Sequence, residues 1–138
     1  MFQTGQGFTF TTAITDEDVR RSALISKDVQ PLHLDPTYAD RTHFRRPIVP
    51  DSLILGRLGG LIEARLVDPQ THYVVTEKID AHFTNPVFAG DQLVVHTNVD
   101  AWNDDRGRLT VSVEVHNQEE HLVLNGTASF AVFPLTPA

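Results

Sequence analysis

The sequence has 138 residues, 41% of them apolar and 21% charged, which is the composition of a folded globular protein, and we expect one domain over residues 1–138. A net charge of −7 argues against binding to nucleic acid, which requires a basic surface. The absence of cysteine excludes disulfides, thiolate metal sites and thiol nucleophiles.

The N-terminal part of the chain predicts a strand followed by short helices. Its first ten residues lack the pattern of a signal peptide, no stretch could span a membrane, and we expect a cytoplasmic protein. Residues 6–13 alternate aromatic side chains with threonine, which predicts a strand. Thr15, followed by Asp18 at the third position, predicts the start of a helix. Residues 26–36 contain two prolines and predict an irregular loop, and residues 36–41 predict one or two helical turns.

The stretch 51–66, DSLILGRLGGLIEARL, predicts the helix around which the chain is built. Its apolar residues leave only a narrow polar strip on a helical wheel, which indicates a buried helix. Its glycines, Gly56, Gly59 and Gly60, each disfavour a helix by roughly 1 kcal/mol relative to alanine. We therefore expect another backbone to approach this helix closely.

After residue 66 the apolar period changes to two, which is typical of strands. Four further strands are predicted, at residues 71–84, 92–102, 108–116 and 121–133. Gly126 is expected at a bulge or at a close approach of two backbones. Helices followed by a run of antiparallel strands predict an α+β fold, in which a sheet of about five strands wraps one long helix.

Asp28 and His33 are the residues that we single out as a catalytic pair. They lie five positions apart in the loop before the central helix, and Pro31 between them restricts the backbone. A carboxylate and an imidazole held together can act as general acid and base on one water. The alternative from the residues alone is an aspartate that caps a turn and an exposed histidine.

The remaining histidines and a group of basic residues are candidates for metal ligands and for a phosphate-binding site, respectively. Five histidines show no metal-ligand spacing, so we expect no metal: His72, His82, His96, His116 and His121. A basic group before the central helix consists of Lys27, Arg41, Arg45 and Arg46. This group either suits a coenzyme A or phosphopantetheine phosphate or consists of exposed loop charges.

The stretch 26–35, SKDVQPLHLD, resembles the hydratase signature of MaoC-like hot-dog proteins, the (R)-specific enoyl-CoA hydratases and 3-hydroxyacyl-thioester dehydratases. That signature reads Ser-Gly-Asp-x-Asn-Pro-(Leu/Ile)-His. Residues 46–50, RPIVP, are similar to the family segment before the helix, and residues 83–93 to its strand-corner motif. The resemblance covers about residues 8–133 and implies a hot-dog fold, in agreement with the periodicity.

The resemblance also implies roles for individual residues. Asp28 and His33 match the pair that handles the water added to, or removed from, the carbon–carbon double bond of a thioester. The amides at the start of the helix, at Asp51 and Ser52, would polarise the thioester carbonyl, and either residue is the expected N-cap. No cofactor is implied. The expected substrate-binding residues are Gln30, Pro31 and Phe83.

The sequence departs from the family pattern close to the expected site. Lys27 replaces the glycine of the signature, and Gln30 replaces its asparagine. Asp51 replaces the glycine that opens the helix, and Gly59 replaces a serine that some members carry. An acidic side chain beside the carbonyl would oppose developing negative charge unless it points away.

The leading prediction is a reversible hydratase/dehydratase of an enoyl or (R)-3-hydroxyacyl thioester, carried by coenzyme A or an acyl carrier protein. Two alternatives remain open: a hot-dog thioesterase, and a non-catalytic subunit that binds an acyl thioester. A single sheet leaves a free edge and an open helix face, so we also expect a homodimer with the sheets joined edge to edge.

Overall fold

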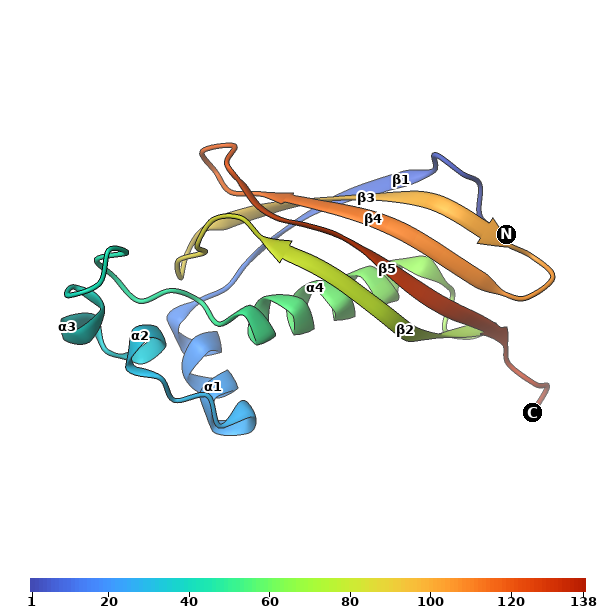
Figure 1. Ribbon diagram of the computed structural model, residues 1–138. Coiled ribbons are helices and arrows are strands. Elements are labelled where there is room, and N and C mark those ends of the chain that lie inside the picture. Colours follow the sequence, from blue (N-terminus) through green and yellow to red (C-terminus); the bar gives the residue numbers. More distant parts are fainter.

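The computed structural model describes residues 1–138 and contains five strands and four helices (Figure 1). The strands are β1 (Gly7–Ala13), β2 (His72–Phe83), β3 (Gln92–Asn103), β4 (Arg108–His116) and β5 (Leu122–Pro134). The helices are α1 (Asp16–Ser26), α2 (Pro31–Leu34), α3 (Pro36–Ala39) and α4 (Asp51–Leu66). The α+β class and the predicted central helix are therefore confirmed.

The strands form one antiparallel sheet in the order β1-β3-β4-β5-β2, so that β1 and β2 are its two edges. Figure 1 shows the sheet curving over α4, which runs along one of its faces. The three short helices gather at one end of the sheet, and both termini lie at the other end. This is the hot-dog arrangement that the sequence resemblance implies. None of the helices combines the length and the apolar character needed to cross a membrane.

The core lies between α4 and the sheet because both present an apolar face there. On α4 the buried residues are spaced by four, at Ile54, Leu58, Ile62 and Leu66. On the sheet the alternate inward residues are buried, among them Leu93, Val95, Leu109, Val111, Val115 and Val123. Each large apolar side chain buried in this way contributes about 1.5–3 kcal/mol.

The side of α4 that faces away from the sheet is open, as expected for a helix covered by a single sheet. A Cβ atom added at Gly56, Gly59 or Gly60 would meet no atom within 4 Å. The prediction that another backbone approaches these glycines is therefore wrong within this chain. The physical reason is that one five-stranded sheet covers only one side of a helix.

Two local predictions are confirmed and one is wrong. Thr15 and Asp18 form a capping box at the start of α1. At Gly126 the backbone of β2 comes so close that a Cβ would collide with the carbonyl oxygen of Asp80. The predicted loop 26–36 instead contains α2, which begins at Pro31 because the fixed φ of proline suits the first position of a helix.

Candidate active site

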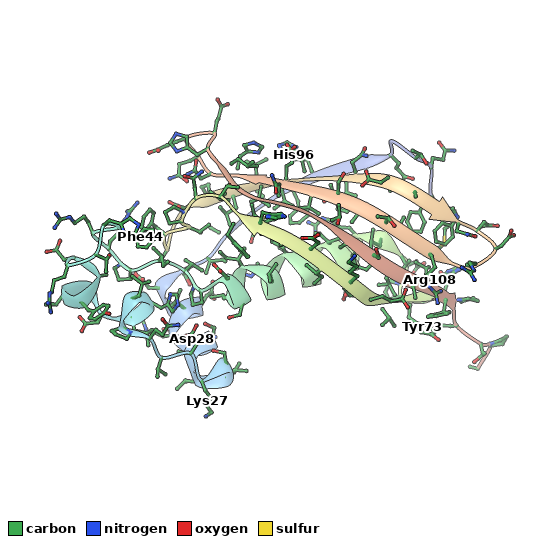
Figure 2. The ribbon with its side chains drawn as sticks, viewed as in Figure 1. Lys27, Asp28, Phe44, Tyr73, His96 and Arg108 are labelled. Atoms are coloured by element: carbon green, nitrogen blue, oxygen red, sulfur yellow. The ribbon has the colours of Figure 1, made fainter.

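Asp28 lies at the end of the molecule where the short helices gather (Figure 2), and the His33 side chain lies beside it. Asp28 follows the end of α1, and His33 lies on α2. Oδ2 of Asp28 is 3.5 Å from Nε2 of His33. The His33 side chain is 10% exposed and that of Asp28 29%, so the pair is shielded but open to a small molecule.

The orientation of the His33 ring is set by a backbone carbonyl. Nδ1 of His33 lies 2.8 Å from the carbonyl oxygen of Ile48. A carbonyl oxygen can only accept, so Nδ1 carries the hydrogen, and Nε2 is the nitrogen that faces Asp28. Ile48 is held in turn by its amide, which donates to the Leu32 carbonyl at 3.2 Å. Nε2 is therefore the ring nitrogen that is free of backbone contacts and faces the carboxylate.

Gln30 contacts Asp28 and positions its carboxylate. Oδ1 of Asp28 accepts from the Gln30 amide at 3.4 Å and from its side-chain Nε2 at 3.2 Å. The Asp28 amide donates to Oγ of Ser26 at 3.1 Å. With Oδ1 occupied, Oδ2 is the oxygen that faces His33.

Lys27 has a left-handed backbone, with φ of 65°, at the C-cap of α1. Its amide donates to the Ala23 carbonyl and closes the helix. A side chain in this conformation costs about 1–2 kcal/mol, which glycine avoids. The backbone thus explains why the family signature has glycine here, and the chain reverses direction into Asp28 despite the substitution.

The start of α4 differs from the prediction. Pro50 is the N-cap, and its carbonyl accepts from the amides of Leu53 and Ile54 at 3.1 and 3.2 Å. The expectation that Asp51 or Ser52 caps the helix is wrong, because Pro50 already occupies the extended position and Asp51 is the first helical residue. The amides of Asp51 and Ser52 form no hydrogen bond within the chain, and they remain available to an acceptor.

Two hollows adjoin α4. The helix-start cavity, of about 260 Å³, is lined by Asp51, Phe44, Phe83 and Asn85 among others. The apolar cleft, of about 50 Å³, lies between α4 and β2 and is lined by residues that include Gly59, Ile62 and Ile79. The structure therefore brings Asp51 and Phe83 together in one cavity, while Gly59 belongs to the other.

Arg57 connects α4 to β1 and α1, a role that is not among the predictions from the sequence. From α4 it donates to Oγ1 of Thr12 at 3.1 Å, to the Ala13 carbonyl at 2.8 Å and to Oδ2 of Asp18 at 2.9 Å. The amide of Thr15 and then Arg57 lower the pKa of the Asp18 carboxyl below its usual value. Arg57 fixes α1, and with it the approach to Asp28, against α4. An arginine within an otherwise apolar stripe was the available signal.

The histidines outside the pair do not form a metal site. No three His, Asp or Glu side chains converge on a point where they could hold a metal ion. His96 projects from the face of the sheet opposite α4 (Figure 2), and its ring centroid lies 5.9 Å from that of His116.

The sequence is similar to that of a known protein family and to those of characterised enzymes. Residues 2–122 match the model of the MaoC like domain. An (R)-specific enoyl-CoA hydratase of Aeromonas caviae is 32% identical over 111 residues, which are 80% of this chain and 81% of that protein. A mitochondrial 3-hydroxyacyl-[acyl-carrier-protein] dehydratase of Arabidopsis thaliana is 28% identical over 127 residues, 90% of this chain and 73% of that protein.

The fold is also similar to that of a solved structure. The (R)-hydratase from A. caviae involved in PHA biosynthesis superimposes with a TM-score of 0.85 and 28% identity, and the match covers 94% of this chain and 96% of that one. The family model spans far more than half of the chain, and the structural match spans nearly all of it. The chain belongs to the MaoC-like domain family and has its hot-dog fold.

Proposed function

We propose that this protein is a hydro-lyase that adds water to enoyl thioesters and removes it from (R)-3-hydroxyacyl thioesters, with Asp28 and His33 as its catalytic residues. The observation that carries the assignment is the 3.5 Å approach of the Asp28 carboxylate to Nε2 of His33. The relatives named for hydration and dehydration of such thioesters support the reaction class.

The pair is arranged to handle both protons of the reaction. During hydration, one group takes a proton from water while the water oxygen bonds to the β-carbon of the thioester. The electron pair of the double bond moves toward the thioester carbonyl, and the other group returns a proton to the α-carbon. Dehydration follows the same steps in reverse.

The start of α4 supplies the electrophilic part of the site. The free amides of Asp51 and Ser52 would donate hydrogen bonds to the thioester carbonyl oxygen as it gains negative charge, and the helix dipole adds to their effect. Asp51 also lines the helix-start cavity, but its side chain is exposed and makes no capping bond, so it is free to rotate its carboxylate away from that oxygen.

The hollows suggest where the substrate lies. Phe83 lines the helix-start cavity and would contact the thioester arm, with Pro31 and Gln30 bordering the pair. The apolar cleft beside Gly59 would take the acyl chain, because glycine leaves more room there than serine. The carrier is coenzyme A or an acyl carrier protein.

The functional unit in this proposal is a homodimer joined through β2. This twelve-residue edge strand leaves apolar side chains exposed: Tyr73 at 47%, Val75 at 48% and Ile79 at 51%. A long apolar edge strand is a template for pairing with another strand. Gly59, on the open face of α4, lines the apolar cleft together with Ile79 of β2.

The dimer is tested by charge placed on each edge of the sheet. Val75→Lys on β2 should convert the dimer to a monomer in light scattering at micromolar protein. Thr9→Lys, on the exposed side of the other edge strand β1, is the matched control and should leave it dimeric. A wild-type monomer under these conditions would contradict the proposal.

The reaction is tested with a short enoyl-CoA. A hydratase removes the absorbance of the conjugated thioester without releasing thiol. Release of thiol would instead identify a thioesterase, and absence of both signals would identify a binding subunit. A carrier-protein thioester of the same acyl group, assayed in parallel, covers the second carrier.

A further inference from the structure

Three arginines in the segment before α4 have no role in the reaction described above. They are Arg41, Arg45 and Arg46, and residues 41–50 contain no acidic side chain. None of the three forms an ion pair, although four arginines elsewhere in the chain pair with carboxylates. In a protein with a net charge of −7, this segment is a local concentration of uncompensated positive charge.

Two of these guanidinium groups are held in place by uncharged partners. The guanidinium carbon of Arg46 lies 3.7 Å from the ring centroid of Phe88. Nη1 of Arg45 donates to the carbonyl oxygen of Asp40 at 3.0 Å. Such partners orient a guanidinium group and leave its charge and its remaining donors free.

The backbone of Arg45 indicates that the side chain is retained at a cost. Its φ of 66° lies in the left-handed region, where glycine would be unstrained. Backbone strain at a residue with a long charged side chain suggests that this side chain has a function. Lys27, the other basic residue with positive φ, lies on the far side of Asp28 from Phe44 (Figure 2), so it does not belong to this group.

Two hollows that share wall residues extend from the start of α4 to Arg46. The helix-start cavity includes Asn85 and Pro86 in its wall. The same two residues line a second hollow of about 150 Å³, whose wall also contains Arg46 and Phe88. A flexible arm whose thioester lies at the start of α4 can therefore extend past Asn85 and Pro86 to the guanidinium group.

Two carboxylates in the second hollow are already engaged. Asp91 accepts from the Phe88 amide at 3.0 Å and from Nε2 of Gln118 at 3.1 Å. Glu119 lies 3.6 Å from Nδ1 of His121. Both carboxylates keep their charge, but neither forms an ion pair with Arg46, so the guanidinium donors of Arg46 remain free for an anion.

We propose that Arg45 and Arg46 bind the phosphate of the phosphopantetheine arm that carries the acyl chain. This inference rests on the hydratase/dehydratase function proposed above. The same phosphate occurs in coenzyme A and in the phosphodiester of an acyl carrier protein, and planar guanidinium donors suit both.

The test compares enoyl thioesters of 4′-phosphopantetheine and of pantetheine, which differ only in the phosphate. The measured quantity is the ratio of their kcat/KM values. Arg46→Gln should lower this ratio about ten- to hundredfold, the usual worth of a hydrogen bond to a charged group. Arg65→Gln is the matched control, because Arg65 also lies over an aromatic ring, that of Phe10 at 4.2 Å, but in the last turn of α4.

The outcomes separate this proposal from the proposed reaction. An Arg46→Gln ratio equal to that of the wild type would overturn the phosphate site while leaving the reaction intact. If the wild type turned over neither thioester, nor enoyl-CoA, the proposed reaction would fail instead. A larger Arg46→Gln effect on enoyl-CoA than on the carrier-protein thioester would assign the phosphate to coenzyme A, and the reverse would assign it to the carrier protein.

Arg45→Gly separates backbone strain from phosphate binding. The variant removes the charge and relieves the left-handed backbone, so the unfolding midpoint should rise while the phosphate ratio falls. A higher midpoint with an unchanged ratio would exclude Arg45 from the phosphate site.

Discussion

The sheet with α4 and the segment 27–50 are held in place by different forces. Of the 20 residues in the main apolar cluster, Val49 alone comes from the segment. The segment relies on hydrogen bonds instead: the Val49 amide donates to the Val87 carbonyl at 2.7 Å, and the Thr37 amide donates to the Asp35 carboxylate at 3.0 Å. Both catalytic candidates, Asp28 and His33, lie in this segment.

The residues that stabilise the fold and the residues of the proposed chemistry are therefore located in separate parts of this molecule. Apolar burial under the sheet supplies most of the folding free energy. The segment adds little burial, but its turns and short helices fix the directions of polar side chains. Substitutions in the two parts should therefore have separable effects on turnover and on stability.

The largest expected effect is on turnover, from changes to the pair. Asp28→Asn keeps the size of the side chain but cannot take a proton, and His33→Ala removes the imidazole. Each should lower kcat by about 10²–10⁴-fold, because a positioned acid or base contributes that much. Thermal unfolding should stay near the wild-type midpoint, since neither residue belongs to the apolar cluster.

The two substitutions should also be non-additive. Residues that act on one water form a unit, so the double variant should be little slower than either single variant. Fully multiplicative losses in kcat would show that Asp28 and His33 act in separate steps.

A substitution in the sheet should lower stability without lowering turnover. Leu109 on β4 is fully buried, with 0% exposure. Leu109→Ala should lower the free energy of unfolding by about 2–5 kcal/mol through lost burial and a cavity. Denaturant titration measures this loss, and kcat per folded molecule should remain that of the wild type. A fall in kcat comparable to that of Asp28→Asn would break the separation between the two parts.

Arg57 connects the two parts, so its loss should be intermediate. Arg57→Met keeps the length and apolar stem but loses three hydrogen bonds, at an expected cost of about 1–2 kcal/mol. In the folded protein, the pKa of Asp18 is lower than in the unfolded chain. The ionised Asp18 therefore stabilises the fold at pH values above its unfolded pKa, and this contribution is lost as the pH falls through its folded pKa. The difference between variant and wild type in urea midpoint should therefore narrow below about pH 4. A difference that stays constant from pH 7 to pH 3 would show that Asp18 is not the partner that matters.

The smallest effect is a gain in stability at Lys27. Lys27→Gly should raise the free energy of unfolding by about 0.5–1 kcal/mol, because glycine avoids the left-handed strain but loses more conformational freedom on folding than lysine does. Lys27→Ala keeps the Cβ and should show no such gain. Equal unfolding midpoints for the glycine and alanine variants would mean that the backbone at this position is not strained.

The sequence was sufficient for the elements whose pattern is long. The sixteen-residue apolar helix and the alternating strands were predictable because burial repeats along them with a fixed period. The pairing of Asp28 with His33 was predictable from the motif and from the proline between them. Gln30 could be placed near the site, but its bond to Asp28 needed the structure.

The remaining features depend on contacts between distant segments. A four-residue helix such as α2 is too short to show a period. The N-cap at Pro50 depends on backbone angles rather than on side-chain type. The open glycine face of α4 follows from how far the sheet reaches around the helix, which residues 51–66 do not encode.

The central claim, that Asp28 and His33 deliver water to the β-carbon of a thioester, is tested most directly by the fate of the water oxygen. A short enoyl-CoA is incubated with the enzyme in water enriched in oxygen-18, and the products are separated by mass spectrometry. We predict that label enters the β-hydroxyl of an intact 3-hydroxyacyl thioester, at a rate that falls with Asp28→Asn. Label found in a free carboxylic acid, with release of thiol, or an undiminished rate in Asp28→Asn, would contradict the account.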